Sequence, residues 1–163
     1  MSKTRLKVIH VTATTDAESI GDNKVIAQSI EFPGTFETSR GRAMLRSIQI
    51  LDETTTGPAV DILISSTDFA ITGDEGKAIG EDIDDLDVAF RNMQGHVSIA
   101  ASDWTDMFDA KMATKTNINL VLHAANNTDR SIYLYVINRS GANWTAATVN
   151  DMKIKLGVEQ QTL

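Results

Sequence analysis

Hydrophobic and polar residues alternate along most of this chain, and this period of two constrains its fold more than any other feature. The clearest example is the segment Met44–Ile64, in which Ile48 and Ile50 precede a turn and Val60, Ile62 and Ile64 follow it. Successive side chains of a strand point to opposite faces, so the alternation predicts two half-buried strands. The residues between them include Asp52, Gly57 and Pro58. Such residues favour a turn, and the segment is therefore predicted to be a hairpin.

The same alternation recurs from one end of the chain to the other. Further candidate strands begin near Leu6 and Val8, and others cover Ile26–Phe32 before Pro33-Gly34, Val97–Ala101, Ile118–Ala124, Ile132–Ile137 and Met152–Val158. Short strands separated by turn-rich loops are typical of antiparallel sandwiches rather than of parallel α/β sheets. The sequence predicts a mainly β protein of at least seven strands, an antiparallel two-layer β-sandwich or jelly roll with one short amphipathic helix.

The predicted helix covers Ile83–Met93. Asp82 is its expected N-cap, and Gly95 is its expected left-handed C-terminal stop. One apolar stripe follows from the spacing i, i+3, i+7 and i+10 of Ile83, Leu86, Phe90 and Met93.

Length and charge limit the organisation and the partners. A chain of 163 residues is expected to form a single domain, 1–163, with mobile loops at 12–23 and 72–82. The net charge of −7 disfavours direct binding of nucleic acid, and the absence of cysteine excludes disulfides and thiolate chemistry. The first residues contain only a short apolar run, so neither a signal sequence nor a membrane span is expected, and synthesis in a cytoplasm follows.

Two loop segments resemble ligand sites only superficially. The acidic residues Glu81, Asp82, Asp84, Asp85 and Asp87 lack the alternating ligands of a calcium loop and are better explained as charges in the first turn of a helix. The glycines of segment 73–80 have the wrong spacing for a phosphate-binding loop. No metal and no other cofactor is expected.

The three histidines suggest no catalytic site. His10, His96 and His123 each occupy an alternating position in a candidate strand, far in sequence from one another. No Gly-x-Ser-x-Gly element is present to place a nucleophile beside one of them. We therefore expect a protein that is not an enzyme.

Aromatic residues in two loops have two possible roles. Trp104, Phe108 and Met112 recur at i, i+4 and i+8, which fits one helical turn packed on the sandwich. Alternatively, Trp104 and Phe108 are anchors of an interface, because aromatic loop residues often dominate binding. Trp144 is open to the same two interpretations.

Two strands are apolar on both faces. Val121 lies opposite Leu120 and Leu122 in one of them, and Tyr133, Tyr135 and Ile137 form a second apolar face in the other. Either a helix or loop of the same chain covers these side chains, or a neighbouring subunit does. Near the N-terminus, Lys3, Arg5 and Lys7 alternate on one strand face. They suit either an acidic partner surface or a solvated sheet edge guarded by lysine.

Several of these segments also resemble a known family. They are Ile48–Asp52, Val60–Ile64, Gly95–Ala101, Asp103, Ala113-Thr114-Lys115 and Asn117–Leu122. In order and spacing they resemble the small β-sandwich virion proteins of tailed bacteriophages. The resemblance implies a virion structural protein without catalytic residues. Within that class, the resemblance favours a capsid decoration, or cement, protein on the surface of the virion. Such a protein binds the major capsid protein and often forms trimers.

Other functions remain open beside this one. A phage tail, head-fibre or adaptor component belongs to the same class. A carbohydrate-binding β-sandwich would use Trp104, Trp144 or Tyr133 as stacking platforms for sugar rings.

Overall fold

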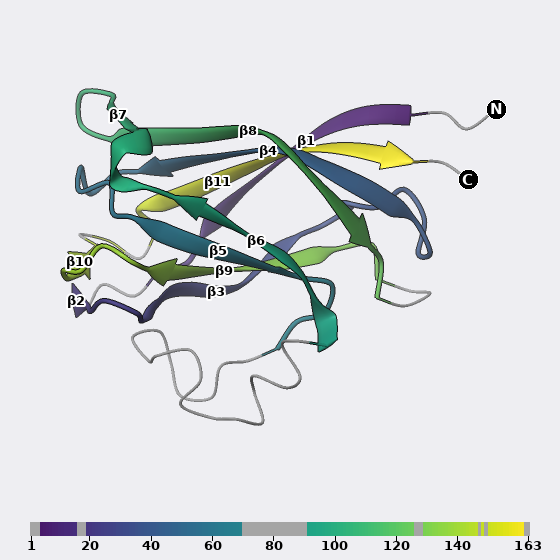
Figure 1. The fold of residues 1–163 in the computed structure, drawn as a ribbon, viewed down its shortest axis with the longest axis horizontal. Helices are drawn as coiled ribbons and strands as arrows, with labels where there is room; N and C mark the ends of the chain where they lie inside the picture. The colour runs from purple at the N-terminus through teal and green to yellow at the C-terminus, as the bar shows by residue number, and fades with distance from the viewer. Residues whose placement is uncertain are drawn as a thin grey trace.

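Two antiparallel sheets packed face to face make up the described part of the molecule (Figure 1). The structure is a computed structural model, and it describes residues 4–15, 19–69, 91–125, 129–146, 148 and 150–161. One sheet has five strands, in the order β1 (Thr4–Ala13), β11 (Met152–Gln161), β4 (Arg42–Asp52), β8 (Lys111–His123) and β7 (Trp104–Asp106). The other has four, in the order β3 (Val25–Phe32), β9 (Ile132–Asn138), β5 (Val60–Ser65) and β6 (Met93–Ile99). Two short strands, β2 (Ser19–Ile20) and β10 (Trp144–Thr145), pair with each other, and a 3₁₀ turn at Ala101–Asp103 precedes β7.

The order of the strands is that of a jelly roll. Within the described ranges, eight strands have six or more residues, and they divide into two sets of four, β1-β11-β4-β8 and β3-β9-β5-β6. Among these described strands, successive members alternate between the two sheets, except that β5 and β6 lie in the same sheet. This order corresponds to two Greek-key motifs, and eight strands arranged in two Greek keys define the jelly-roll architecture. The prediction of a mainly β, antiparallel two-layer sandwich is confirmed.

The predicted hairpin of segment Met44–Ile64 is wrong in its pairing, although both of its strands exist. β4 lies in the five-stranded sheet and β5 in the four-stranded sheet, so their connection crosses from one layer to the other. The fully buried carboxylate of Asp52 holds this crossing, because it accepts hydrogen bonds from the backbone N–H groups of Thr54 (3.0 Å) and Gly57 (2.8 Å). The indole N–H of Trp144 points to the same carboxylate at 3.4 Å.

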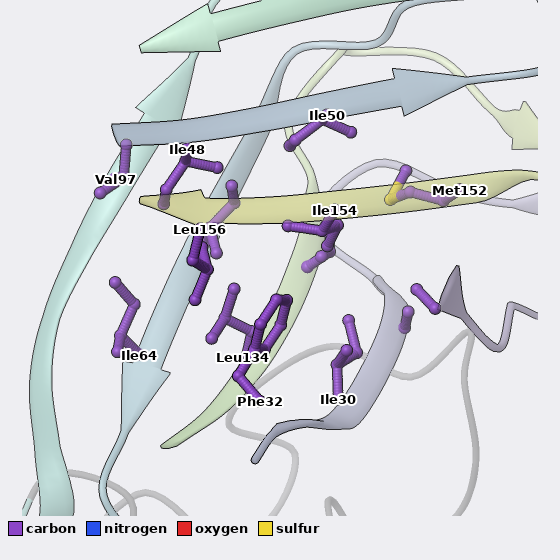
Figure 2. Packing of buried hydrophobic residues seen from close by; sticks show 14 of the residues in the cluster. Ile30, Phe32, Ile48, Ile50, Ile64, Val97, Leu134, Met152, Ile154 and Leu156 are labelled. Atoms are coloured by element: carbon purple, nitrogen blue, oxygen red, sulfur yellow. The ribbon is translucent and has the colours of Figure 1, made fainter. Parts of the chain in front are cut away.

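Branched aliphatic side chains fill the space between the sheets. Figure 2 shows side chains of both layers meeting there, among them Ile48, Ile50, Ile154 and Leu156 from the five-stranded sheet and Ile64 and Leu134 from the other. All six are fully buried. Complete burial of such a side chain stabilises the fold by about 1.5–3 kcal/mol, so this apolar layer is the main stabilising element.

Contacts between the sheets also close the two sides of the sandwich. On one side, the Gln94 side-chain oxygen accepts the backbone N–H of His123 at 2.9 Å, which joins β6 to β8. On the other side, the Gln160 amide donates to the carbonyls of Gly34 (2.8 Å) and Thr35 (3.0 Å), just after β3. Gln160 is almost completely buried, and its paired amide fixes the end of β11 over the four-stranded sheet.

The predicted helix Ile83–Met93 lies almost entirely outside the described residues. Arg91 and Asn92, at its expected end, are helical. The expected stop at Gly95 is wrong, because Met93 begins β6 and Gly95 pairs with Ile64 inside that strand. A Cβ at Gly95 would lie 2.9 Å from the methyl groups of Leu120. The glycine therefore allows β6 to approach β8 closely, and it does not terminate a helix.

Of the two segments expected to be mobile loops, 12–23 is partly described and 72–82 is not described. In segment 12–23, Thr12 and Ala13 extend β1, and Ser19 and Ile20 form β2. Residues 16–18 and the whole of segment 72–82 lie outside the described residues, as do the acidic cluster 81–87 and the glycine-rich segment 73–80.

Replacement of Asp52 by asparagine should destabilise the protein. Gly57 and Trp144 donate to one carboxylate oxygen and the backbone N–H of Thr54 to the other. An amide offers one acceptor oxygen in place of two, so either the N–H of Thr54 or those of Gly57 and Trp144 would lose their partner. We expect a loss of about 1–3 kcal/mol in the free energy of unfolding, measured by urea denaturation. The control is Glu53→Gln, which removes only the half-exposed ion pair with Lys153 and should cost less than about 1 kcal/mol. Equal losses for both variants would contradict this role of Asp52.

Candidate interaction surfaces

The apolar faces assigned from the sequence to one interface lie on different sheets. Val121 is in β8 of the five-stranded sheet, whereas Tyr133, Tyr135 and Ile137 are in β9 of the other. Tyr135 is completely buried and Ile137 is 3% exposed, so neither is a surface residue of this chain. Of the two alternatives for this face, the structure supports cover by the same chain for Tyr135, and the buried Ile137 is likewise not available as an interface residue.

The cover over Tyr135 is the segment that follows β5. The ring of Phe69 stacks on the ring of Tyr135, with centroids 4.0 Å apart and planes inclined by 20°. The Tyr135 hydroxyl accepts the backbone N–H of Phe69 (2.8 Å) and donates to the Asp68 carboxylate (3.0 Å). Burial raises the pKa of the Tyr135 phenol. Tyr133 remains half-buried, and burial together with the charges of Asp129, Glu31 and Asp68 raises its pKa to about 12.

Trp144 is also an internal residue. Its side chain is fully buried, and its strand β10 pairs with β2. The indole cannot act as an interface anchor or as a platform for a sugar ring while it is enclosed in this way. Of the two interpretations of Trp144, the structure supports a residue packed within the protein.

Trp104, Phe108 and Met112 belong to a hairpin and not to a helical turn. Trp104 pairs with Ala113, and Met112 pairs with Thr105, across the antiparallel strands β7 and β8. The half-buried Trp104 ring packs against Gly57, and its indole N–H donates to the Pro58 carbonyl at 2.8 Å. The base of this hairpin is thus fixed to the connection between β4 and β5.

A second contact strengthens the base. The Asp103 carboxylate pairs with Lys115 at 2.7 Å and accepts the backbone N–H of Ala100 at 2.7 Å. The hydrogen bond from Lys115, followed by that from Ala100, lowers the pKa of Asp103 below its usual value. Because the folded-state pKa is lowered, this contribution to stability is present above the unfolded pKa and is lost as pH falls through the folded value.

At the tip of the hairpin, residues 107–110, the first three residues are by contrast exposed. The backbone N–H of Met107 donates to the Ala110 carbonyl at 2.7 Å and closes the turn. The side chain of Phe108 is 103% exposed, and its φ of 61° lies in the left-handed region that a bulky residue rarely adopts. The structure therefore displays an aromatic side chain without contacts on a rigid base, and this hairpin tip is the first candidate interaction surface.

The second candidate is the outward side of the five-stranded sheet. Leu6 and Val8 of β1 are 76% and 72% exposed, and Val121 of β8 is 46% exposed. The sequence did not reveal the orientation of β1, because Ile9 and Val11 make its opposite face equally apolar. On the same outward side, a shallow depression of about 190 Å³ is lined by His10, Gln49, Leu51, Met112, Lys153 and Lys155.

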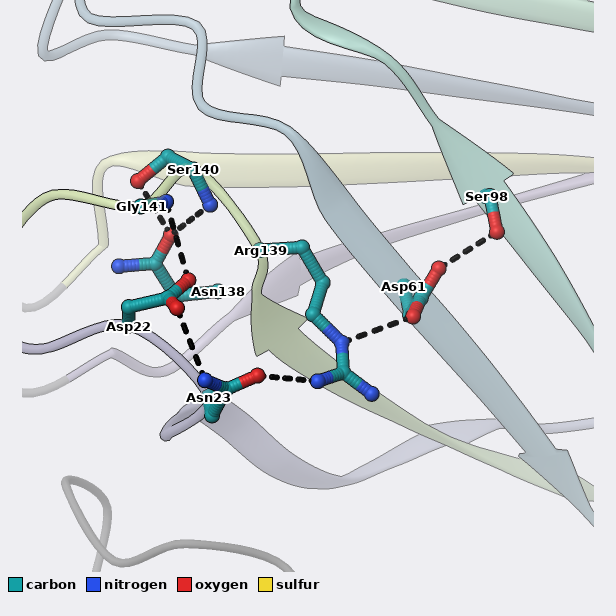
Figure 3. Close-up of polar contacts among 8 residues, drawn as sticks. All are labelled: Asp22, Asn23, Asp61, Ser98, Asn138, Arg139, Ser140 and Gly141. Carbon is teal, nitrogen blue, oxygen red and sulfur yellow. Dashed lines mark hydrogen bonds and ion pairs between the residues drawn. The ribbon is translucent and has the colours of Figure 1, made fainter.

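A cluster of charged residues on the four-stranded sheet is occupied by internal contacts. Figure 3 shows Arg139, which follows β9, paired with Asp61 of β5 at 2.9 Å, while Ser98 of β6 donates to the same carboxylate. The guanidinium also donates to the side-chain oxygen of Asn23. These groups hold the end of β9 against its neighbours, and the cluster is best explained as structural.

Within the described ranges, no group of three or more histidine, aspartate and glutamate side chains is arranged to hold a metal ion. His10, His96 and His123 lie in three different strands, β1, β6 and β8, and all three are exposed. The helical segments in this part of the chain are all too short to cross a membrane.

Comparison with known proteins gives only distant similarities. No protein-family model matches the chain, and no match was found among curated proteins. Among solved structures, one of tomato aspermy virus is 10% identical, covers 98% of this chain and 78% of its own, and has a TM-score of 0.41. A structure of Desmodium yellow mottle tymovirus is 10% identical, with 100% and 89% coverage and a TM-score of 0.32. A native virion of Kashmir bee virus is 10% identical, with 99% and 72% coverage and a TM-score of 0.30.

Replacement of Phe108 by asparagine should leave the fold intact and stabilise it slightly. Asparagine tolerates a positive φ better than phenylalanine, and the exposed ring contributes no packing. We expect the free energy of unfolding to stay unchanged or to rise by up to about 1 kcal/mol, as measured by urea denaturation. A loss of more than about 1 kcal/mol would mean that the ring packs within the protein.

Proposed function

We propose that this protein is a non-enzymatic structural component of a virion, and more narrowly a capsid decoration, or cement, protein that binds a shell of major capsid protein from outside. The jelly roll supports the proposal, because viral capsid domains, lectins and cupins are the main users of this architecture. The segments of the chain that resemble tailed-phage virion proteins support it further. Ile48–Asp52 and Val60–Ile64 belong to β4 and β5, on either side of the crossing that Asp52 holds.

The interior of the sandwich favours a structural role over ligand binding between the sheets. Side chains such as Phe32, Ile48, Ile62 and Leu134 are completely buried and occupy the space between the layers (Figure 2). Contacts with other molecules must then involve the outside of the protein.

Carbohydrate binding is less well supported than it was from the sequence. Three aromatic residues were expected to stack on sugar rings. Trp144 is enclosed, and Trp104 packs on Gly57 and donates its indole N–H to the Pro58 carbonyl. Tyr133 is half-buried, and its hydroxyl donates to Asp129 at 3.2 Å. Stacking on a sugar needs an open aromatic face beside free polar groups, and these residues already have internal partners.

The observation that carries the proposal is the exposed Phe108 on its fixed hairpin. An aromatic side chain that enters a pocket of a partner commonly contributes a large part of the binding energy. Because the base is fixed by Trp104 and by the Asp103–Lys115 pair, little backbone entropy is lost when the tip is bound. A decoration protein needs such a preorganised contact. Association into trimers, as the resemblance implies, would present three tips to the shell and raise the avidity.

The test of this proposal is binding to virus particles from which the protein has been removed. Wild-type protein should rebind these particles, whereas Phe108→Asn should bind at least about tenfold more weakly because the aromatic anchor is absent. The control His96→Gln changes an exposed residue of the other sheet and should bind like the wild type. Cosedimentation of labelled protein with particles measures all three. Undiminished binding of Phe108→Asn would exclude the hairpin tip as the contact.

The abundance of the chain in purified particles tests the narrower part of the proposal. A decoration protein repeats over the shell, so its copy number should approach that of the major capsid protein, as measured by quantitative mass spectrometry. A copy number far below that of the shell protein would instead identify a tail, head-fibre or adaptor component. Absence from particles would refute a role in the virion.

A further inference from the structure

The edges of the two sheets differ in their protection against pairing with another strand. In the described part of the chain, β7 at one edge has three residues, and the edge strand β3 is interrupted by two register shifts against β9. The edge strand β6 has a register shift at its Ile64–Ser65 pairing with β5. Short or bulged edges of this kind resist further pairing. β1 lacks both features, since its ten residues pair with β11 in continuous register from Thr4 to Ala13.

The first half of β1 is also exposed. Thr4, Arg5, Leu6 and Val8 are exposed, and only Lys7 among the first five residues is half-buried. The backbone N–H and C=O groups on the free side of an edge strand have no partner within the sheet. This part of β1 can therefore accept a further strand.

The side chains of β1 differ between its two faces. Leu6 and Val8 point to the outward side of the sheet and are largely exposed. Arg5 and Lys7 point to the other side, where the Lys7 ammonium donates to the Gly34 carbonyl at 2.7 Å. The strand carries no acidic residue, although the whole chain has a net charge of −7. A strand that pairs with this edge would meet apolar side chains on one face and cations on the other.

This charge pattern determines which occupant fits. Pairing of β1 with β1 of a second copy would place two basic strands side by side, and like charges on adjacent strands are destabilising. An incoming strand with acidic side chains on one face would pair with Arg5 and Lys7, and apolar side chains on its other face would cover Leu6 and Val8. We propose that the free edge of β1 binds an extended segment of a partner protein, with alternating acidic and apolar residues, as an additional strand of the five-stranded sheet.

This binding does not depend on a role in a virion, since it follows from the edge strand alone. It also uses a surface separate from the hairpin tip. In Figure 1 the start of β1 lies at the end of the sandwich where both chain termini are, and β7 lies at the opposite end. Failure of one proposal therefore leaves the other intact.

The experiment uses a capped synthetic peptide of about eight residues that alternates valine with glutamate, a length typical of a strand. Titrated into isotope-labelled protein, it should shift the amide resonances of β1 and protect β1 amide hydrogens from exchange with solvent. A peptide with lysine in place of glutamate should bind at least about tenfold more weakly, because its charges repel Arg5 and Lys7. Raising the salt concentration should weaken binding of the glutamate peptide.

Two variants with the same change in charge separate edge pairing from general attraction. Arg5→Glu places an acidic side chain on the free edge and should weaken binding about tenfold. Lys155→Glu changes an exposed lysine of the neighbouring strand β11, away from the edge, and should have less than about a third of that effect. Equal losses for the two variants, equal binding of the lysine peptide, or shifts confined to residues outside β1 would each overturn the proposal. If the glutamate peptide does not bind the folded wild-type protein, the proposal is also overturned.

Discussion

The buried carboxylate of Asp52 is the interaction on which the layered arrangement depends. It turns the chain sharply at the end of β4 by accepting the N–H groups of Thr54 and Gly57, so that β5 begins in the opposite sheet. Without that crossing, β4 and β5 would pair side by side in one sheet. The apolar side chains of β5 would then no longer cover those of β4 from the opposite sheet. The same connection supports the candidate interaction surface at the hairpin tip, because Gly57 and Pro58 contact Trp104 at the base of the β7–β8 hairpin. One turn therefore specifies both the fold and the position of Phe108.

Sequence periodicity predicted the strands well and their partners poorly. The candidate strands from Ile26–Phe32 to Met152–Val158 all correspond to strands of the structure, because alternation reports burial on one face of a strand. It does not report which sheet a strand joins. For the segment Met44–Ile64, a seven-residue connection with Gly57 and Pro58 fits a hairpin as well as a crossing, and only the burial of Asp52 distinguishes them. Gly95 was misassigned for a related reason, since its role is the close approach of Leu120, which lies far away in sequence.

The candidate surface was predictable in part. Phe108 was recognised as a possible anchor from its residue type, and the structure exposes it fully. Trp144 was selected by the same criterion, and it is buried beside Asp52. Tyr135 was selected because its strand is apolar on both faces, and it is buried under Phe69. Residue type alone cannot separate these cases, because an aromatic side chain stabilises a core and an interface through the same loss of apolar surface to water. The exposure of Leu6 and Val8 was not predicted, because both faces of β1 are apolar and the sequence does not show which face is outward.

The exposed features of the molecule differ in the kind of partner they favour. Phe108 offers one compact apolar group on a rigid support, which suits a preformed pocket in a folded partner. The edge of β1 offers backbone groups over several residues, which suit an extended segment that acquires its structure on binding. A single subunit that used both would contact a folded surface at one end and a chain segment at the other. Because both contacts are attached to the same core, binding at one of them restricts the positions that the other can reach. The distance between the hairpin tip and the β1 edge therefore determines which two partner sites one subunit can bind at the same time.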